Sequence, residues 1–226
     1  MKGKKPKVEN NKNELIRIES LLDTSDEIDV NSDNFNKIMF IYSVGIKELQ
    51  TKIEIMKDEF KIFYDYDLID HVQTRIKSID SIKKKMEDRG LKFTYKEMIQ
   101  YVNDIAGVRI ICPMQKDIFS IRNLIEELPG IRILKEKDYV TNPKKSGYSS
   151  YHLVLEVPIV LSQKKLYVKV EVQIRTMAMD FWASLEHRIK YKSNKQLTKA
   201  ESKDLITYAK MVRKLDNKMM LIHERN

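Results

Sequence analysis

The sequence predicts an α/β (α+β) fold in which a mixed β-sheet of about five strands is flanked by helices, with further helices at both ends of the chain. Two observations lead to this prediction. Strand-like apolar runs alternate with helical patterns over residues 68–137, and two more strands follow with a short turn between them at 161–164. Strands that are joined both by helices and by a hairpin have parallel as well as antiparallel neighbours.

The first predicted helix covers residues 34–63. Apolar residues recur there at three- and four-residue spacing, and residues 31–33 offer candidate N-caps. Because Gly45 lies within this pattern, we expect either one long helix with a weak point at the glycine or two abutting helices. A short amphipathic segment at 15–22 precedes this helix.

The middle of the chain alternates strands and helices after a predicted loop at 65–67. The expected order is a strand at 68–78, a helix at 79–89 that ends at Gly90, a short helix that begins with a capping box at 94–97, a strand at 107–113, a helix at 116–128, and strands at 131–137, 148–158 and 166–175. Residues 138–147, rich in Lys, Asn, Pro and Gly, are predicted to form a loop before the last two strands.

Two helices are predicted to complete the chain. The first, over residues 177–191, carries an apolar stripe that we expect to face the core. This stripe consists of Ala178, Phe181, Leu185 and Ile189. The second, over 198–224, begins with a capping box of Thr198 and Glu201. We expect this C-terminal element, residues 196–226, to serve in packing or oligomerisation.

Composition indicates an intracellular protein with anionic partners. The 42 Lys and Arg exceed the 33 Asp and Glu, which gives a net charge of +9 and favours nucleic acids and nucleotides without separating them. The single cysteine, Cys112, excludes an internal disulfide, and no apolar run approaches the roughly 20 residues of a membrane span. We therefore expect a cytoplasmic protein without membrane contact, whose basic extension at 1–30 is partly disordered.

A row of cations is the first candidate site. Arg75 and Lys77 share one face of a predicted strand, and the next helix begins after Ser78 and carries three lysines at 83–85. Cations beside a helix N-terminus suit a polyphosphate. A solvated basic face has the same composition, so this segment alone leaves both readings open.

Two carboxylates supply the next candidates. Asp104 directly precedes one predicted strand, and Glu171 lies on the polar face of another together with Lys169, Gln173 and Arg175. Carboxylates from two strands can bind Mg²⁺, which prefers hard oxygen ligands. The alternatives are a turn or cap role for Asp104 and a surface ion-pair ladder for Glu171.

The predicted loop before strand 148–158 adds an aromatic ring. Tyr148 follows Gly147 and is expected to be exposed, where its ring can stack on a nucleobase. Lys144 in the same loop can meet phosphates.

Taken in order, these segments resemble the synthetase domain of the RelA/SpoT family, most closely its small alarmone synthetases. The matching residues lie at 75–85 (Arg75, Lys77, Ser81, Ile82, Lys85), 104–109 (DIAGVR), 137–148, 150–152 (SYH), 171–176 (EVQIRT) and 180–187. The resemblance covers about residues 35–215. It implies a nucleotidyltransferase-like synthetase domain at 31–195.

The resemblance implies transfer of the β,γ-pyrophosphate of ATP to the 3′-hydroxyl of GDP or GTP, which yields AMP and the alarmones ppGpp or pppGpp of the stringent response. Asp104 and Glu171 would be catalytic and bind Mg²⁺, with Glu171 as general base, second metal ligand or both. The ATP-binding residues would be Arg75, Lys77, Ser81, Lys85 and Arg109, and the GDP- or GTP-binding residues Lys144, Tyr148, His152, Gln173 and Arg175.

Further expectations also come from the resemblance. Small family members often form tetramers, so we expect a homo-oligomer. The metal-dependent hydrolase of long members needs a His-Asp pair, which this sequence lacks, so no hydrolase activity is expected. Arg89 is a candidate contact on the adenine side, whereas Glu186 and His187 are interpreted as helix-packing residues or supports behind the site.

Three other functions compete with this interpretation. A nucleic-acid-binding module would fit the basic surface, but carboxylates among the cations would repel phosphates unless a metal intervened. A nucleotidyltransferase acting on another acceptor commonly has a Gly-Ser loop, and this chain has no Gly-Ser dipeptide. An inactive nucleotide receptor would not need both carboxylates. RNA binding as a secondary activity, allosteric control by an alarmone and the choice between GDP and GTP stay open.

Overall fold

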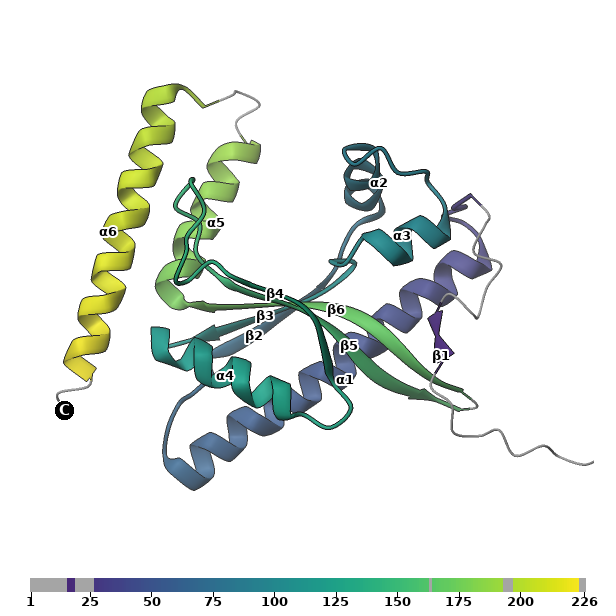
Figure 1. Ribbon diagram of the computed structural model, residues 1–226, viewed down its shortest axis with the longest axis horizontal. Helices are drawn as coiled ribbons and strands as arrows, with labels where there is room; N and C mark the ends of the chain where they lie inside the picture. The colour runs from purple at the N-terminus through teal and green to yellow at the C-terminus, as the bar shows by residue number, and fades with distance from the viewer. Residues whose placement is uncertain (1–15, 19–26, 163, 193–196, 224–226) are drawn as a thin grey trace, which may run out of the picture.

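A six-stranded mixed sheet forms the centre of the molecule (Figure 1). Five strands lie in the order β2 (His71–Ile76), β3 (Ala106–Cys112), β6 (Lys164–Thr176), β5 (Tyr151–Leu161) and β4 (Arg132–Asp138). Strands β3 and β6 are parallel, and the other neighbours in this order are antiparallel. The predicted mixed sheet and its β5–β6 hairpin are confirmed. The two-residue β1 (Ile16–Arg17), parallel to β6, adds a strand that the sequence did not predict.

The structure is a computed structural model that describes residues 16–18, 27–162, 164–192 and 197–223. The predicted disorder of the N-terminal extension therefore falls largely outside the described residues, as does most of the amphipathic segment at 15–22. Within the described ranges, no helix combines the length and the apolar character that crossing a bilayer requires.

Helix α1 (Asp33–Tyr64) runs unbroken along one face of the sheet (Figure 1), and α4 (Gln115–Glu127) lies on the same side. The hydroxyl of Ser32 caps α1 by accepting a hydrogen bond from the backbone of Phe35. Gly45 is not a weak point, contrary to the prediction. A Cβ at this glycine would lie only 3.0 Å from Val168 on β6, so Gly45 brings the helix close to the sheet.

Helices α2 (Ile79–Glu87) and α3 (Tyr95–Tyr101) lie on the other side of the sheet (Figure 1). Thr94 caps α3 as predicted, because its hydroxyl accepts from the backbone of Glu97. The carboxylate of Glu97 accepts from the backbone of Lys92 instead of that of Thr94, so the predicted capping box is only half formed. Gly90 ends the α2 region with a positive φ of 66°, which favours glycine.

Helices α5 (Met177–Lys192) and α6 (Lys199–His223) stand beside each other on the same side, across from α2 (Figure 1). The predicted core stripe of α5 is wrong: Phe181 is 61% exposed, and Leu185 and Ile189 are each 41% exposed. Met179, Trp182 and Ala183 are buried instead. Helical spacing reveals an apolar face but not which face its neighbours cover.

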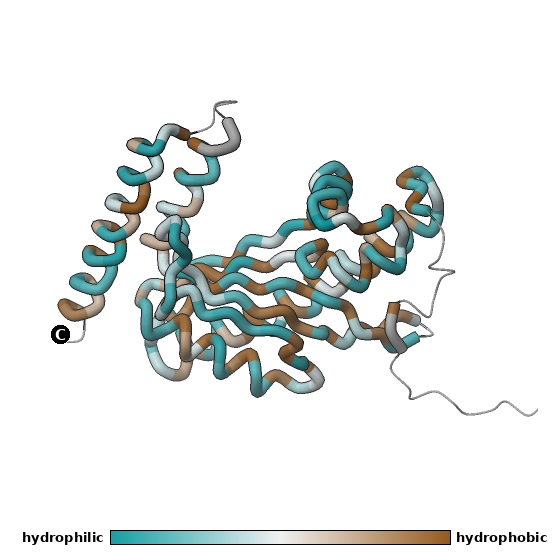
Figure 2. The backbone as a smooth tube through the Cα atoms, turned by 45° about the horizontal axis from the view of Figure 1, so that its top comes forward, coloured by the Kyte–Doolittle hydropathy of each residue, from teal (hydrophilic) through white to brown (hydrophobic). Residues whose placement is uncertain are grey.

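The main core lies between the sheet and α1. Val170, Val172 and Ile174 are fully buried, which confirms the predicted packing face of β6. Figure 2 shows hydrophobic stretches along the strands, whereas α2 is mainly hydrophilic. Because side chains alternate along a strand, the residues between these three point to the opposite face of the sheet, where α2 and α5 stand.

Candidate active site

A cavity of about 1070 Å³ has walls contributed by α2, the central strands and α5. All residues predicted to be catalytic, ATP-binding or GDP- or GTP-binding, apart from the adenine-side candidate Arg89, line it: Arg75, Lys77, Ser81, Lys85, Asp104, Arg109, Lys144, Tyr148, His152, Glu171, Gln173 and Arg175. The predicted residues thus come together, although they are spread over about a hundred positions of the chain.

Strand register explains this convergence. In one row across the sheet, Arg75 on β2 pairs with Gly107 on β3, which pairs with Glu171 on β6. Gly107 has no side chain, and a Cβ built there would lie 3.5 Å from Cγ of Arg75. The missing side chain leaves space for Arg75 over β3. In a neighbouring row, Arg109 on β3 pairs with Gln73 on β2 and with Gln173 on β6. Gln173 in turn pairs with His152 on β5.

Asp104 is a buried carboxylate between two lysines. Its Oδ2 lies 3.1 Å from Nζ of Lys77, and its Oδ1 lies 2.8 Å from Nζ of Lys85. Burial opposes its ionisation, but the two ammonium groups outweigh burial and lower the pKa of Asp104 below its ordinary value. Asp104 is therefore ionised at neutral pH.

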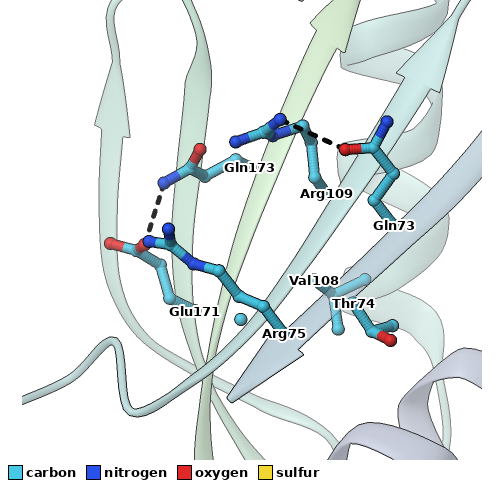
Figure 3. Close-up of a pocket in the computed structure, with 8 residues that line it drawn as sticks. Gln73, Thr74, Arg75, Val108, Arg109, Glu171 and Gln173 are labelled. Carbon is cyan, nitrogen blue, oxygen red and sulfur yellow. Dashed lines mark hydrogen bonds between the residues drawn. The ribbon is translucent and has the colours of Figure 1, made fainter. Parts of the chain in front are cut away.

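Glu171 is half-buried and is oriented by its neighbour on the same strand face. Nε2 of Gln173 donates to Oε2 of Glu171 at 2.9 Å (Figure 3). The alternative of a surface ion-pair ladder along this strand does not include Arg175. This residue is only 4% exposed and pairs with Asp180 at 2.9 Å. Lys169 donates to backbone carbonyls at the end of α3.

Arg175 is the centre of a buried hydrogen-bond network. Its guanidinium donates to the Tyr148 hydroxyl at 2.7 Å and to Oε1 of Gln173 at 2.6 Å. Asp180, which accepts from Arg175, also lies 3.1 Å from Nη1 of Arg109. Arg175 therefore contacts Gln173, which orients Glu171, and also the hydroxyl of Tyr148. Through Asp180 it is linked to Arg109 on β3.

Tyr148 is half-buried, not exposed as predicted. Its hydroxyl accepts from Arg175 and is also hydrogen-bonded to Nε2 of His152, 2.7 Å away. Burial and the charges of Arg175 and Lys144 lower the pKa of His152 to about 3, so its imidazole is neutral. Nδ1 of this imidazole lies 3.9 Å from Oε1 of Glu171.

Two smaller cavities lie at Glu171. One, of about 180 Å³, lies over β2, β3 and β6 and is shown in Figure 3 with the side chains of Arg75, Arg109 and Glu171. The other, of about 270 Å³, has Glu171 and Asp104 in its wall together with cations. These cations are Lys85, Arg89, Lys135, Lys137 and Lys144. Glu171 therefore belongs to both spaces.

Sequence reasoning missed several residues of these walls. Gln73 accepts from Arg109 at 3.2 Å and lines the smaller cavity (Figure 3). Glu186 and His187, interpreted from the sequence as helix-packing residues or supports behind the site, line the large cavity together with Arg188. The sequence had singled out these two within the segment 180–187, and their spacing from the buried Ala183 places them on its side of α5.

The carboxylates fit a magnesium ion that shares its ligands with substrate. Among the described residues there is no cluster of three or more His, Cys, Asp or Glu that could hold a metal by itself. Asp104 and Glu171 nevertheless face the same cavities and offer oxygen ligands. Mg²⁺ is commonly bound by one or two carboxylates while phosphates and waters complete its shell, so this donor set is suitable.

Comparison with known proteins identifies the family. Residues 74–196 match a model described as a region found in RelA / SpoT proteins, and this region ends before α6. The GTP pyrophosphokinase YwaC of Bacillus subtilis is 40% identical over 195 residues, which cover 86% of this chain and 93% of that protein. The GTP pyrophosphokinase YjbM of the same organism is 29% identical over 82% of this chain and 86% of its own length. The chain belongs to the RelA/SpoT family.

Solved structures agree with this assignment. Small alarmone synthetase 2 of Bacillus subtilis is 38% identical with a TM-score of 0.78, covering 86% of this chain and 100% of its own. Small alarmone synthetase 1 of the same organism, bound to its product pppGpp, is 28% identical with a TM-score of 0.79, covering 86% of this chain and 98% of its own. The resemblance predicted from the motifs is confirmed, as is the α+β fold.

Proposed function

We propose that this protein is a GTP pyrophosphokinase that transfers the β,γ-pyrophosphate of ATP to the 3′-hydroxyl of GDP or GTP and produces ppGpp or pppGpp together with AMP. The observation that carries this proposal is that Glu171 belongs to two adjoining cavities. One has the arginines Arg75 and Arg109, and the other has Lys137 and Lys144 together with Lys85 and Asp104, which lie between the two proposed sites. Two polyanionic nucleotides that must react with each other need such an arrangement.

Arg75, Lys77, Ser81, Lys85 and Arg109 form the proposed donor site. Planar guanidinium groups bind phosphate in bidentate fashion and also stack on bases, so Arg75 and Arg109 suit ATP. Lys77 and Lys85 form ion pairs with Asp104 in the structure. Their ammonium groups can also contact the phosphates of a bound nucleotide. The amide of Gln73 beside Arg109 adds a polar contact in the same space.

The acceptor site is proposed around Tyr148. Its hydroxyl is occupied by Arg175 and His152, so the ring face is the surface that remains for stacking on guanine. Nζ of Lys144 lies 4.8 Å from the centre of this ring. We expect the base to replace Lys144 there, which leaves its ammonium group for the acceptor's phosphates.

Glu171 is the proposed general base. A carboxylate is a far weaker base than an alkoxide, so it takes the proton usefully only as the new O–P bond forms. Gln173 donates to one carboxylate oxygen and leaves the other for the 3′-hydroxyl. Cations stabilise the charge on the transferred group, which is the main requirement of phosphoryl chemistry.

Mg²⁺ is the proposed cofactor, and Asp104 and Glu171 would hold it. When bound, it would neutralise the charge of the donor phosphates. Asp104 suits this role because it is ionised, and its lysine partners fix the position of its carboxylate.

Two statements about the protein in the cell accompany this proposal. We propose that it acts in the cytoplasm, where ATP and GTP are available, and that it forms a homo-oligomer, as a tetramer. Exposed apolar residues on α5 and α6, among them Phe181, Met211 and Leu215, support oligomerisation. RNA binding and allosteric control by an alarmone stay predictions.

Product analysis tests the proposed function. Purified protein is incubated with ATP, Mg²⁺ and either GDP or GTP, and the nucleotides are separated by ion-exchange chromatography. We expect AMP and a guanosine nucleotide that carries a 3′-pyrophosphate. The proposal is wrong if no such nucleotide forms over a range of concentrations, or if ADP is the adenine product.

A further inference from the structure

Helix α6 lies against the loop that carries Tyr148, although it follows the region matched by the family model. Ala209 on α6 is buried, and a Cβ placed on Gly147 would lie only 2.4 Å from its Cβ. Gly147 also has a φ of +91°, a conformation that other residues rarely adopt. The loop and α6 therefore approach each other as closely as a glycine allows.

A small hydrophobic core, separate from the core under the sheet, joins α5, α6 and the same loop. It consists of Trp182, Ala183 and Ala209, with Tyr148 and Val212 packed against it. The indole N–H of Trp182 donates to the carbonyl of Leu205 on α6 at 3.3 Å. Tyr148 is thus packed against both α5 and α6.

A buried polar contact provides a second link to α6. Oδ2 of Asp216 accepts from the hydroxyl of Thr176 at 2.8 Å, and Oγ1 of Thr176 accepts from the backbone N–H of Met179 at 3.2 Å. Burial raises the pKa of Asp216, although the Thr176 bond partly offsets this. The contact fixes the first turn of α5, which contains the Asp180 that pairs with Arg175.

We propose that α6 is part of the acceptor-nucleotide site and that Ala209 and Asp216 are positioning residues for Tyr148. Ala209 fixes the loop at Gly147 by direct contact. Asp216 fixes the start of α5, whose Asp180 orients Arg175 toward the Tyr148 hydroxyl. This inference rests on the proposed function, because it takes the ring of Tyr148 as the platform for guanine. Ala209 acts on acceptor affinity and not on the transfer step, whereas the link through Asp216 also reaches Gln173 by way of Arg175.

Ala209→Leu tests the direct contact, since the larger side chain displaces the loop at Gly147. We expect the KM for GDP or GTP to rise about tenfold, as Tyr148→Ala would also cause, while the KM for ATP changes less than about twofold. Lys210→Leu, at an exposed position on the same helix, is the matched control and should behave as the wild type. Equal changes in both KM values, or no change in either, would overturn the role of Ala209.

The polar link is tested by two substitutions of Asp216. Asn retains an oxygen that can accept from Thr176, so Asp216→Asn should keep the acceptor KM near that of the wild type, whereas Asp216→Ala should raise it severalfold. Asp204→Ala, at an exposed carboxylate of α6, serves as the control. If Asn and Ala have the same effect, this hydrogen bond does not position the site.

A loss of stability alone is distinguishable from this role. KM does not depend on the fraction of folded protein, so a merely destabilised variant would lower the apparent kcat without an acceptor-selective change. Trp182 is the only tryptophan of the chain, and its fluorescence reports on this core in the unmodified protein. GDP should change its emission more than a non-hydrolysable ATP analogue does.

The outcomes separate the two proposals. If no 3′-pyrophosphorylated guanosine nucleotide forms with the wild type, the proposed function fails. If the wild type makes this product, but Ala209→Leu has no acceptor-selective effect and Trp182 emission responds equally to both nucleotides, only the assignment of α6 is wrong.

Discussion

The polar side chains of β6 that lie on the sheet face toward α2 and α5 have different environments. Lys169 donates to the end of α3, Glu171 faces the cavities, and Arg175 is buried in a network with Asp180. Strand alternation predicts that these side chains share a face, and the family resemblance predicts that Glu171 is catalytic. Neither predicts that Arg175 is enclosed, because its partners Tyr148 and Asp180 come from a loop and a helix whose positions depend on tertiary packing.

Replacing Glu171 separates binding from chemistry. Glu171→Gln keeps the size of the side chain and removes the base, so kcat should fall by about 10²- to 10⁴-fold. Binding of ATP and GDP, measured by titration calorimetry without turnover, should change little. Glu87→Gln, at an exposed position of α2, is the control. A kcat near that of the wild type would contradict the general-base role.

The buried imidazole of His152 makes stability depend on pH. Its pKa is about 3 in the folded protein and about 6.5 when unfolded, so the unfolded chain binds the proton more readily. Its contribution is complete above about pH 6.5 and decreases as the pH falls toward 3. Between pH 7.5 and 5.5 this loss is about 1.4 kcal/mol.

Urea unfolding at these two pH values, at one protein concentration, measures this effect. The decrease in the free energy of unfolding should be smaller in His152→Gln than in the wild type by about 1.4 kcal/mol. His71→Gln, at an exposed histidine, should retain the decrease of the wild type. Identical decreases in the wild type and His152→Gln would show that His152 is not held neutral by the fold.

Helices and strands were largely predictable because their ends carry local signals. Ser32, Thr94 and Thr198 all cap helices where the sequence suggested, and Thr198 forms a full capping box with Glu201. The apolar stripe on α5 was placed wrongly because periodicity does not show what packs on a face. Strand β1 was missed because two residues contain no detectable pattern.

The close packing of α1 on β6 gives a prediction at Gly45. A side chain there would meet Val168, so Gly45→Leu should lower the free energy of unfolding by about 1–3 kcal/mol despite the better helix propensity of leucine. Lys47→Leu, at an exposed position of the same helix, is the control. Denaturant unfolding measures both. An unchanged stability of Gly45→Leu would mean that α1 does not approach the sheet so closely.

The order of the strands needed the whole structure. Strands β3 and β6 are parallel neighbours although about fifty residues separate them in the sequence, and their register places Gly107 beside Glu171. Sequence motifs identified the residues of the site, and the resemblance supplied their roles. The contribution of α6 was not predictable, because Ala209 and Asp216 belong to no motif and reach the site only through tertiary contacts.

At the scale of the assembly, the exposed apolar residues of α5 and α6 predict association of several copies. Light scattering should give a mass of a multiple of 26.8 kDa, four copies for the proposed tetramer. Leu215→Lys places a charge at an exposed apolar position of α6 and should shift the protein toward smaller species, unlike Lys218→Ala. A wild type that is a single monomeric species would contradict oligomerisation.

The central claim is that one cavity brings two nucleotides together for transfer of an intact pyrophosphate to a ribose hydroxyl. The most direct measurement uses ATP labelled either at the β- or at the γ-phosphate, with GDP as acceptor, and follows each label by ion-exchange chromatography. The account predicts that both labels appear in equal amounts at the 3′-position of the guanosine product, with one AMP formed for each product molecule. Transfer of the γ-label alone, with ADP as the other product, would contradict it.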